Sequence, residues 1–408
     1  MPARRMPYRT GALVALSALA LVAAACGGPS GKSAAPKPRH HSRASGSTTT
    51  SSPPRSTSTT TTTTAAPASG GPVPAGFEPV SFTAVSEDDY WLLGTAPCSN
   101  PVCTSIVRTT DGGQQFVGLP APTSPVTTGG TTRSPTAITS LRFADTQDGY
   151  AFGPGSGAPL WDTHDGGEQW TETTLRGVLA FGIGDGDAFA VTGTCASGPC
   201  TGVQLRRTPV VSDDWTALPL PVSSITEVRT MTVHGASLWM SVTRGGVQTS
   251  HETLVVSSDA GGHFSVMQSP CPADLGGTLE AASPTVVWAT CPSGMLAGAY
   301  RTTDGGAIWT PLHAPEMPNS ARIAPADDTT AVITYGSTML RTTDGGASFS
   351  TVYGPGAVHG TWTFVGFTDA STGAAILRTT GGTGLPDHQL WRSTDGGAAW
   401  TGPVAFTS

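Results

Sequence analysis

A nine-residue pattern recurs along most of this 408-residue chain and strongly limits the folds that it can adopt. Its clearest copy is RTTDGGAIW at residues 301–309. The other copies are RTTDGGQQF at 108–116, DTHDGGEQW at 162–170, RTTDGGASF at 341–349, RSTDGGAAW at 392–400, the looser VSSDAGGHF at 256–264 and the worn PVVSDDW at 209–215. Self-similarity of this kind indicates a repeat architecture.

The spacing of the copies predicts the fold. One acid from each copy gives the series Asp111, Asp165, Asp213, Asp259, Asp304, Asp344 and Asp395, with intervals of 54, 48, 46, 45, 40 and 51 residues. Such a period is too long for one hairpin and fits a meander of four short strands. Seven such modules predict an all-β chain, a single seven-bladed β-propeller of four-stranded antiparallel blades.

The residues within the pattern are typical of a tight turn followed by an aromatic wedge. The Thr or Ser and the Asp accept hydrogen bonds from backbone N–H groups, and the glycine pair supplies positive φ. The pattern resembles the Asp-box, or BNR, repeat, S/T-x-D-x-G-x-x-W/F, of sialidases, sortilin-type receptors, xyloglucanases and photosystem II assembly-factor-type propellers. This resemblance implies structural boxes away from any ligand site. It assigns that structural role to Asp111, Asp165, Asp259, Asp304, Asp344 and Asp395, and we expect no catalytic residue, metal or cofactor among them.

The N-terminal region predicts export and anchoring. Residues 1–25 combine basic Arg4, Arg5 and Arg9 with a short apolar run, as in a secretory signal peptide. The sequence LVAAAC resembles a bacterial lipobox, which makes Cys26 the expected lipid-modified residue and the outer face of the bacterial cell membrane the expected location. Residues 26–72 are rich in Ser, Thr and Pro and predict a disordered tether, which leaves 73–408 for the propeller.

The charge of the domain limits the classes of partner that it can bind, and its cysteine count predicts disulfide bonds. From residue 71 onward the chain has 28 acids and 13 arginines, a net charge of −15, whereas the tether is basic. An acidic domain argues against nucleic acid as a partner. Six cysteines remain beyond Cys26, and an even number in an exported domain predicts disulfides. The natural pairs are Cys98 with Cys103 and Cys195 with Cys200, which leaves Cys271 with Cys291.

We expect a monomeric propeller, and the strand patterns predict which of its two faces carries the long loops. Module one predicts strands at 80–85, 90–95 and 105–110, with Phe116 opening a fourth. Ring closure is expected by packing of the first blade on the last, with 73–78 as a less favoured source of a borrowed strand. The repeat turns and the turns between first and second strands then share one tight face. The opposite face receives the insertions, including 117–137, 244–251, 292–299 and 379–388, and is the expected binding face.

Two classes of function fit this arrangement. The first is a non-catalytic binding or assembly propeller that presents its loop-rich face to a protein or a cell-envelope glycan. The candidate residues on that face are Arg142, Arg229, Glu280, Arg322 and Trp362. The alternative is a sialidase-like glycoside hydrolase, which needs an arginine triad for the substrate carboxylate and a paired acid and nucleophile. No such set can be assigned from the sequence, so the binding protein is favoured.

Overall fold

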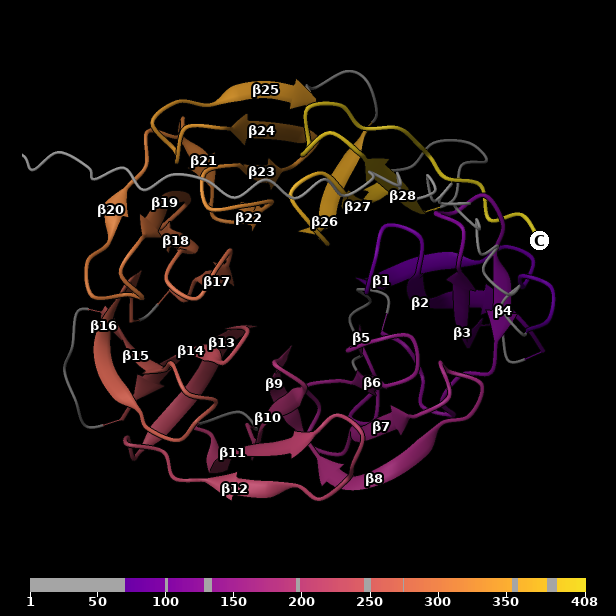
Figure 1. The fold of residues 1–408 in the computed structure, drawn as a ribbon, viewed down its shortest axis with the longest axis horizontal. Helices are drawn as coiled ribbons and strands as arrows, with labels where there is room; N and C mark the ends of the chain where they lie inside the picture. The colour runs from indigo at the N-terminus through magenta and orange to yellow at the C-terminus, as the bar shows by residue number, and fades with distance from the viewer. Residues whose placement is uncertain are drawn as a thin grey trace, which may run out of the picture. The chain divides into compact units, whose positions relative to one another are not determined.

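The computed structural model describes residues 70–99, 102–127, 134–195, 199–245, 251–273, 275–353, 359–379 and 387–408, all in one compact unit of the chain. Within these residues the sheets form a ring of seven antiparallel blades, each with its first strand nearest the centre (Figure 1). The predicted signal peptide, the lipidation of Cys26 and nearly all of the tether lie outside the described residues. No helix of a length and apolarity suited to crossing a membrane occurs in the part of the chain that is described.

The strands follow one another around the ring in sequence order. Blade 1 has β1 (Glu78–Ala84), β2 (Tyr90–Pro97), β3 (Val102–Thr109) and β4 (Val117–Leu119), and blade 2 has β5 (Ser140–Phe143), β6 (Gly149–Phe152), β7 (Pro159–Thr163) and β8 (Thr171–Arg176). Blade 3 has β9 (Val178–Gly184), β10 (Asp187–Thr194), β11 (Thr201–Pro209) and β12 (Thr216–Leu218), and blade 4 has β13 (Ile225–His234), β14 (Ser237–Arg244), β15 (His251–Ser257) and β16 (Ser265–Pro272). Blade 5 has β17 (Thr278–Ala281), β18 (Val287–Ser293), β19 (Leu296–Thr302), β20 (Thr310–Pro311) and β21 (Met317–Pro318). Blade 6 has β22 (Arg322–Pro325), β23 (Ala331–Tyr335), β24 (Thr338–Thr342) and β25 (Ser350–Tyr353), and blade 7 has β26 (Gly360–Phe367), β27 (Gly373–Thr379) and β28 (His388–Ser393).

The prediction of seven four-stranded blades is confirmed. Blade 7 completes its fourth position with an antiparallel bridge between Arg392 and Thr401. One predicted loop is wrong, because residues 292–299 form a hairpin in which β18 and β19 pair down to Ser293 and Leu296. The hairpin closes so tightly because Gly294 takes a φ of 69°, which other residues adopt at a cost.

The core lies between blades rather than inside one sheet. Second strands are buried almost throughout because a neighbouring blade covers each face, as in β2 and β10. One cluster joins Trp91 and Ile106 of blade 1 to Leu141 and Phe143 of blade 2, with the Trp91 and Phe143 rings stacked 3.9 Å apart. The ring of blades is therefore stabilised mainly by apolar contacts between residues distant in sequence.

Six repeat turns share one hydrogen-bond pattern, and we call them the DGG turns. In blade 5 the Thr302 hydroxyl donates to Asp304 Oδ1 at 2.7 Å and accepts from Gly306 N at 3.0 Å, while Ile308 N donates to Asp304 Oδ1 at 2.9 Å. The equivalent bonds recur around Asp111, Asp165, Asp259, Asp344 and Asp395. Blade 3 departs from the pattern, since Thr208 donates instead to Ser212 O. Loss of the glycine pair there explains the different turn.

The ring closes by packing of blade 7 against blade 1, as predicted. Phe82 and Leu92 of blade 1 share a cluster with Ile376 and Leu390 of blade 7. The last residues of the chain cover the same seam, where Phe116 N donates to Thr407 O at 2.8 Å. The segment before β1 forms a bridge to the outer edge of blade 1 through Gly71 and Gly118, so blade 7 receives no strand from it.

Candidate functional site

A layer of seven side-chain positions surrounds the axis of the propeller. In each blade this position is a residue of the first strand that pairs with a residue of the second strand. That second-strand residue pairs in turn with the third-strand position at which most repeat copies begin. The seven are Thr83, Arg142, Gly182, Thr232, Glu280, Ala324 and Gly366. Five are small or short, and the other two, Arg142 and Glu280, are charged. Five of the seven, Thr83, Arg142, Glu280, Ala324 and Gly366, line one cavity of about 240 Å³ together with Phe82 and Phe364.

The two charged residues influence each other across this cavity. Glu280 is open to solvent inside the cavity, but protein atoms surround it. This crowding raises the pKa of Glu280 to about 7, and the guanidinium groups of Arg142 and Arg322 act in the opposite direction. Crowding likewise lowers the pKa of Arg142, and Glu280 opposes that shift. A cavity that presents one acid and one guanidinium is suited to holding a small polar group.

Two of the residues expected on the loop-rich face, Arg142 and Glu280, lie closer to the opposite face. Arg142 and Glu280 are each the last residue but one of β5 and β17, next to the turns that lead into second strands. Those turns share a face with the DGG turns, so Arg142 and Glu280 lie towards the tight face rather than the loop-rich face. Arg322 is the first residue of β22 and lies towards the loop-rich end. Sequence periodicity shows which residues face the axis but not how deep they lie.

Arg229 belongs to a separate network in blade 4. Its guanidinium pairs with Glu227, lies 3.5 Å from Glu252 Oε1 and donates to Ala273 O at 3.3 Å. Glu252 is only 2% exposed, and its other oxygen accepts hydrogen bonds from Ser241 and Ser269. Burial raises the pKa of Glu252 to about 7, against the effect of Ser241 and Arg229. These contacts give Arg229 a structural task.

Trp362 is a core residue. It is 3% exposed and makes edge-on contacts with Tyr353 and Trp391 between blades 6 and 7. The expectation that it lies on the binding face is therefore wrong. The sequence pattern alone allows an aromatic residue on an inner strand to lie either on the exposed face or in the core between blades. The packing of the neighbouring blade decides between these two positions.

The loop-rich face carries the disulfides and most of the large apolar residues that are exposed. All three predicted bonds form, Cys98–Cys103, Cys195–Cys200 and Cys271–Cys291. Val102, Leu275, Met295 and Leu296 lie on this face with exposed fractions of 58, 44, 87 and 45%. A cavity of about 480 Å³ also opens there, lined by Pro135, Leu179, Cys195, Glu227 and others. Parts of the predicted insertions, including 128–133, 246–250 and 380–386, lie outside the described residues.

One cluster of polar residues was missed by the sequence interpretation. Asp162, His164 and Asp213 present donor atoms that lie within 4.8 Å of one another, although they belong to blades 2 and 3. The available signal was the first letter of the second repeat copy, which is Asp162 where four other copies have arginine.

Comparison with solved structures agrees with the class of fold. The chain is similar to YCF48 from Cyanidioschyzon merolae, with 14% identity and a TM-score of 0.51 over 81% of this chain and 99% of that one. It is similar to a puromycin-hydrolysing peptidase of Mycobacterium tuberculosis, with 14% identity and a TM-score of 0.54 over 83% of this chain and 57% of that one. It also resembles the propeller domain of the Trilobed protease from Pyrococcus furiosus, described as having an open velcro topology, with 8% identity and a TM-score of 0.50 over 81% and 99%.

No family model and no curated protein matches the chain. Identities of 8 to 14% show a shared architecture and carry no function across. The protein is thus a seven-bladed β-propeller whose function has to be argued from its own surfaces.

Proposed function

We propose that this protein is a membrane-anchored, extracytoplasmic binding or assembly propeller of the Asp-box type that docks a protein partner on its loop-rich face. The observation that carries the proposal is the exposure of Met295, Leu296 and Leu275 on that face. Large apolar side chains that gather on one surface are typical of interaction sites. The described residues of the tight face expose fewer of them, chiefly Val211 and Ile308.

The elements beneath this surface are held in place before any partner binds. Asn319 N donates to Met295 O at 3.1 Å, and β21 pairs with β19 at Met317 and Ala297. The Cys271–Cys291 bond ties β16 to β18 under the same hairpin. A surface fixed in this way loses little conformational entropy on association, which favours its use for recognition.

Charge indicates the kind of partner. The chain from residue 71 onward carries a net charge of −15, so a neutral or basic protein surface meets it without like-charge repulsion. A cell-envelope glycan is the second partner class, and the two are distinguished by what becomes cross-linked.

Site-specific cross-linking tests the docking surface. A photo-reactive amino acid at Met295 should give a cross-linked protein in intact cells, because this side chain is 87% exposed on the loop-rich face. Ile308 is the matched control, being 70% exposed on a DGG turn. Cross-links at position 308 and none at position 295 would show that the partner docks on the tight face, which contradicts the proposal. Cross-links to carbohydrate alone would replace the protein partner by a glycan.

The anchoring part of the proposal rests on the sequence LVAAAC before a basic tether. Basic residues near a membrane each contribute about 1 kcal/mol of attraction to anionic lipid. Cells fed a clickable fatty acid should label the wild-type protein and leave a Cys26→Ala variant unlabelled. Label retained in the variant contradicts lipidation at Cys26 while leaving the docking surface untouched.

The hydrolase is kept as a second candidate because Arg142 and Glu280 line the axial cavity and Arg322 also acts electrostatically on Glu280. A sialidase binds its substrate carboxylate with three arginines and pairs its acid with a nucleophile. Two arginines and one acid supply part of that set, so we expect no turnover of a fluorogenic sialoside. Turnover that Glu280→Gln abolishes would overturn the non-catalytic assignment.

A further inference from the structure

At most blade junctions an arginine fastens one blade to the next. This arginine is the first residue of the repeat pattern in four blades and is the structurally equivalent Arg207 in blade 3. From the third strand it reaches the repeat turn or the neighbouring turn of the following blade. Arg207 donates to Ala260 O at 2.8 Å, Arg341 donates to Gly396 O at 2.7 Å and Arg392 donates to Glu87 O at 3.2 Å. Arg108 and Arg301 lie against Gly166 and Gly345 in the same way. Three of these five guanidinium groups thus donate to backbone oxygens across a junction.

The junction between blades 2 and 3 reverses the sign of this contact. Asp162 occupies the arginine position, since it pairs with Tyr150 as Arg108 pairs with Trp91. The following turn, in blade 3, is the one that has lost the glycine pair, and it brings a second acid, Asp213, to the contact. Two carboxylates therefore meet where most other junctions have an arginine against the backbone of the next blade.

Asp162 is buried without compensation from the protein. Its side chain is 0% exposed, and neither carboxylate oxygen has a hydrogen-bond partner among the described residues. An isolated buried carboxylate is strongly unfavourable unless a positive charge or a proton neutralises it. The imidazole of His164, two residues further along the chain, acts electrostatically on Asp162 and favours its charged form.

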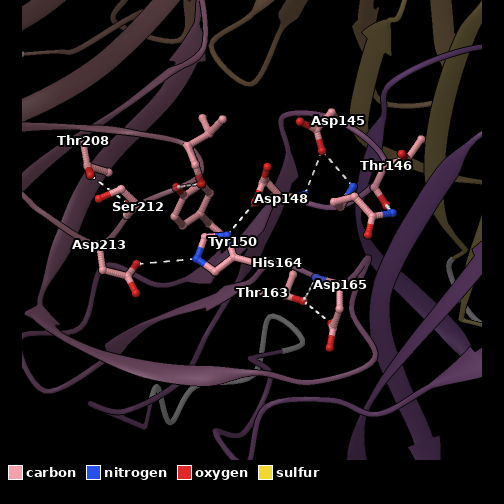
Figure 2. A network of polar contacts seen from close by, with 12 residues as sticks. Asp145, Thr146, Asp148, Tyr150, Thr163, His164, Asp165, Thr208, Ser212 and Asp213 are labelled. Carbon is pink, nitrogen blue, oxygen red and sulfur yellow. Dashed lines mark hydrogen bonds and ion pairs between the residues drawn. The ribbon is translucent and has the colours of Figure 1, made fainter.

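His164 is oriented as a ligand. Its Nδ1 lies 2.5 Å from Asp148 Oδ1, which places the ring proton on Nδ1, and its Nε2 lies 3.9 Å from Asp213 Oδ1 (Figure 2). Asp148 is itself fixed, because Asp145 Oδ1 accepts its backbone N–H at 2.8 Å (Figure 2). A histidine that donates one nitrogen to a carboxylate and presents the other is the usual arrangement behind a protein-bound metal.

We propose that Asp162, His164 and Asp213 bind one divalent metal ion of the zinc class, which bridges blades 2 and 3 in place of the missing arginine. One imidazole nitrogen and two carboxylate oxygens suit Zn²⁺ better than Ca²⁺ or Mg²⁺, which prefer all-oxygen sets. Two bonds to zinc span at most about 4.4 Å, close to the 4.8 Å that bounds the present separations. The half-exposed Asp213 closes the difference by rotation, and its exposure leaves room for a water ligand.

A proton is the competing occupant. Burial, followed by the neighbouring Asp213, raises the pKa of Asp162. One proton shared by the two acids would therefore also remove the unpaired charge. The two occupants differ in a measurable way, because metal binding requires deprotonated ligands and releases that proton.

Calorimetric titration of the purified, chelator-treated chain with ZnSO₄ at pH 7.5 tests the proposal. The wild type should bind one ion per chain, release protons in buffers of different ionisation enthalpy and melt at a higher temperature with zinc. His164→Gln and Asp213→Asn should weaken zinc binding more than about 100-fold, and Asp148→Asn about 10- to 100-fold. Asp213 lies on an exposed turn, so its variant stays informative if a substitution of buried Asp162 prevents folding.

His263→Gln is the matched control. His263 lies in the DGG turn of blade 4 and pairs with Asp259 at 2.6 Å, but within the described parts of the chain no second acid joins them in a cluster. Zinc affinity and the zinc-induced rise in melting temperature should be unchanged in this variant. The proposal is overturned if the wild type binds no zinc, or if His263→Gln weakens binding as much as His164→Gln does. Absence of zinc binding leaves the docking surface around Met295 unaffected.

Discussion

At the scale of single residues, one carboxylate organises each DGG turn. Asp304 is an exposed side chain, yet Oδ1 accepts from both Ile308 N and the Thr302 hydroxyl. The bond from Ile308, and after it that from Thr302, lowers the pKa of Asp304. A carboxylate that is bonded only in the folded chain stabilises the fold in its ionised form. The same holds for Asp344, where Ser348 is the leading donor.

The stability of the fold should depend on pH through these carboxylates. Because the folded pKa of Asp304 is depressed, its stabilisation is complete above the ordinary value of about 4 and is lost as pH falls through the lower folded value. We expect Asp304→Asn to lower the free energy of unfolding at pH 7. Between pH 7 and pH 3 the free energy of unfolding should then fall less in this variant than in the wild type. Urea denaturation at both values measures this. Exposed Asp328→Asn is the control, and equal acid losses in the wild type and Asp304→Asn would contradict the prediction.

At the scale of strands and turns, the aromatic residue after each DGG turn acts as a wedge between blades. Phe116 is 1% exposed and Trp400 9%, but Trp309 is only partly buried against Trp239 and Met267 of blade 4. The place of the wedge is as predicted from the repeat, whereas the depth differs from blade to blade. The burial of the aromatic side chain differs between blades because different side chains of the preceding blade cover it.

The wedge predicts a specific loss of stability. Trp309→Ala should lower the free energy of unfolding by about 2 kcal/mol, less than the 3 to 5 kcal/mol typical of fully buried aromatic residues. Its neighbour Ile308 is 70% exposed, so Ile308→Ala should change stability by less than about 0.5 kcal/mol. Thermal and chemical unfolding of both variants provides the comparison. Equal effects would show that the indole does not pack between blades.

The disulfides differ in what they join. Cys98–Cys103 closes a hairpin within one blade, with a sequence separation of 5, whereas Cys271–Cys291 joins blade 4 to blade 5 with a separation of 20. On the chain-entropy argument the bonds contribute about 2 and about 3 kcal/mol respectively. Replacing both cysteines of each pair by alanine should therefore destabilise the protein more for the second pair. A larger loss from the Cys98–Cys103 pair would contradict this order.

At the scale of the whole molecule, the seam between blades 7 and 1 decides whether the ring holds together. No strand of blade 1 enters blade 7 in the described residues, so closure depends on apolar packing and on the C-terminal segment. Val404 and Phe406 pack on the cluster that contains Phe77 and Phe116, and Phe406 contacts both rings edge-on at 5.1 Å. This seam is the least covalently secured junction of the described ring.

Removal of residues 403–408 should open that seam. We expect faster amide hydrogen exchange in β1–β4 and β26–β28, where the deleted side chains packed, and little change in β13–β16 on the other side of the ring (Figure 1). Replacing Ser408 alone by alanine is the control, since it removes one hydrogen bond, to Val73 N. Uniform acceleration around the whole ring, or none, would show that the C-terminal segment does not hold the closure.

The sequence by itself determined the number of blades, the strand order, the DGG turns and the cysteine pairing. These features follow from interactions over a few residues, such as the Thr302 to Asp304 bond, and from a period long enough to count. Only the tertiary structure decided how deep Arg142 and Glu280 lie, that Trp362 is buried, and that Asp162 and Asp213 meet. Each of these depends on which side chain the neighbouring blade brings to the contact, and a repeat pattern is the same whichever neighbour it meets.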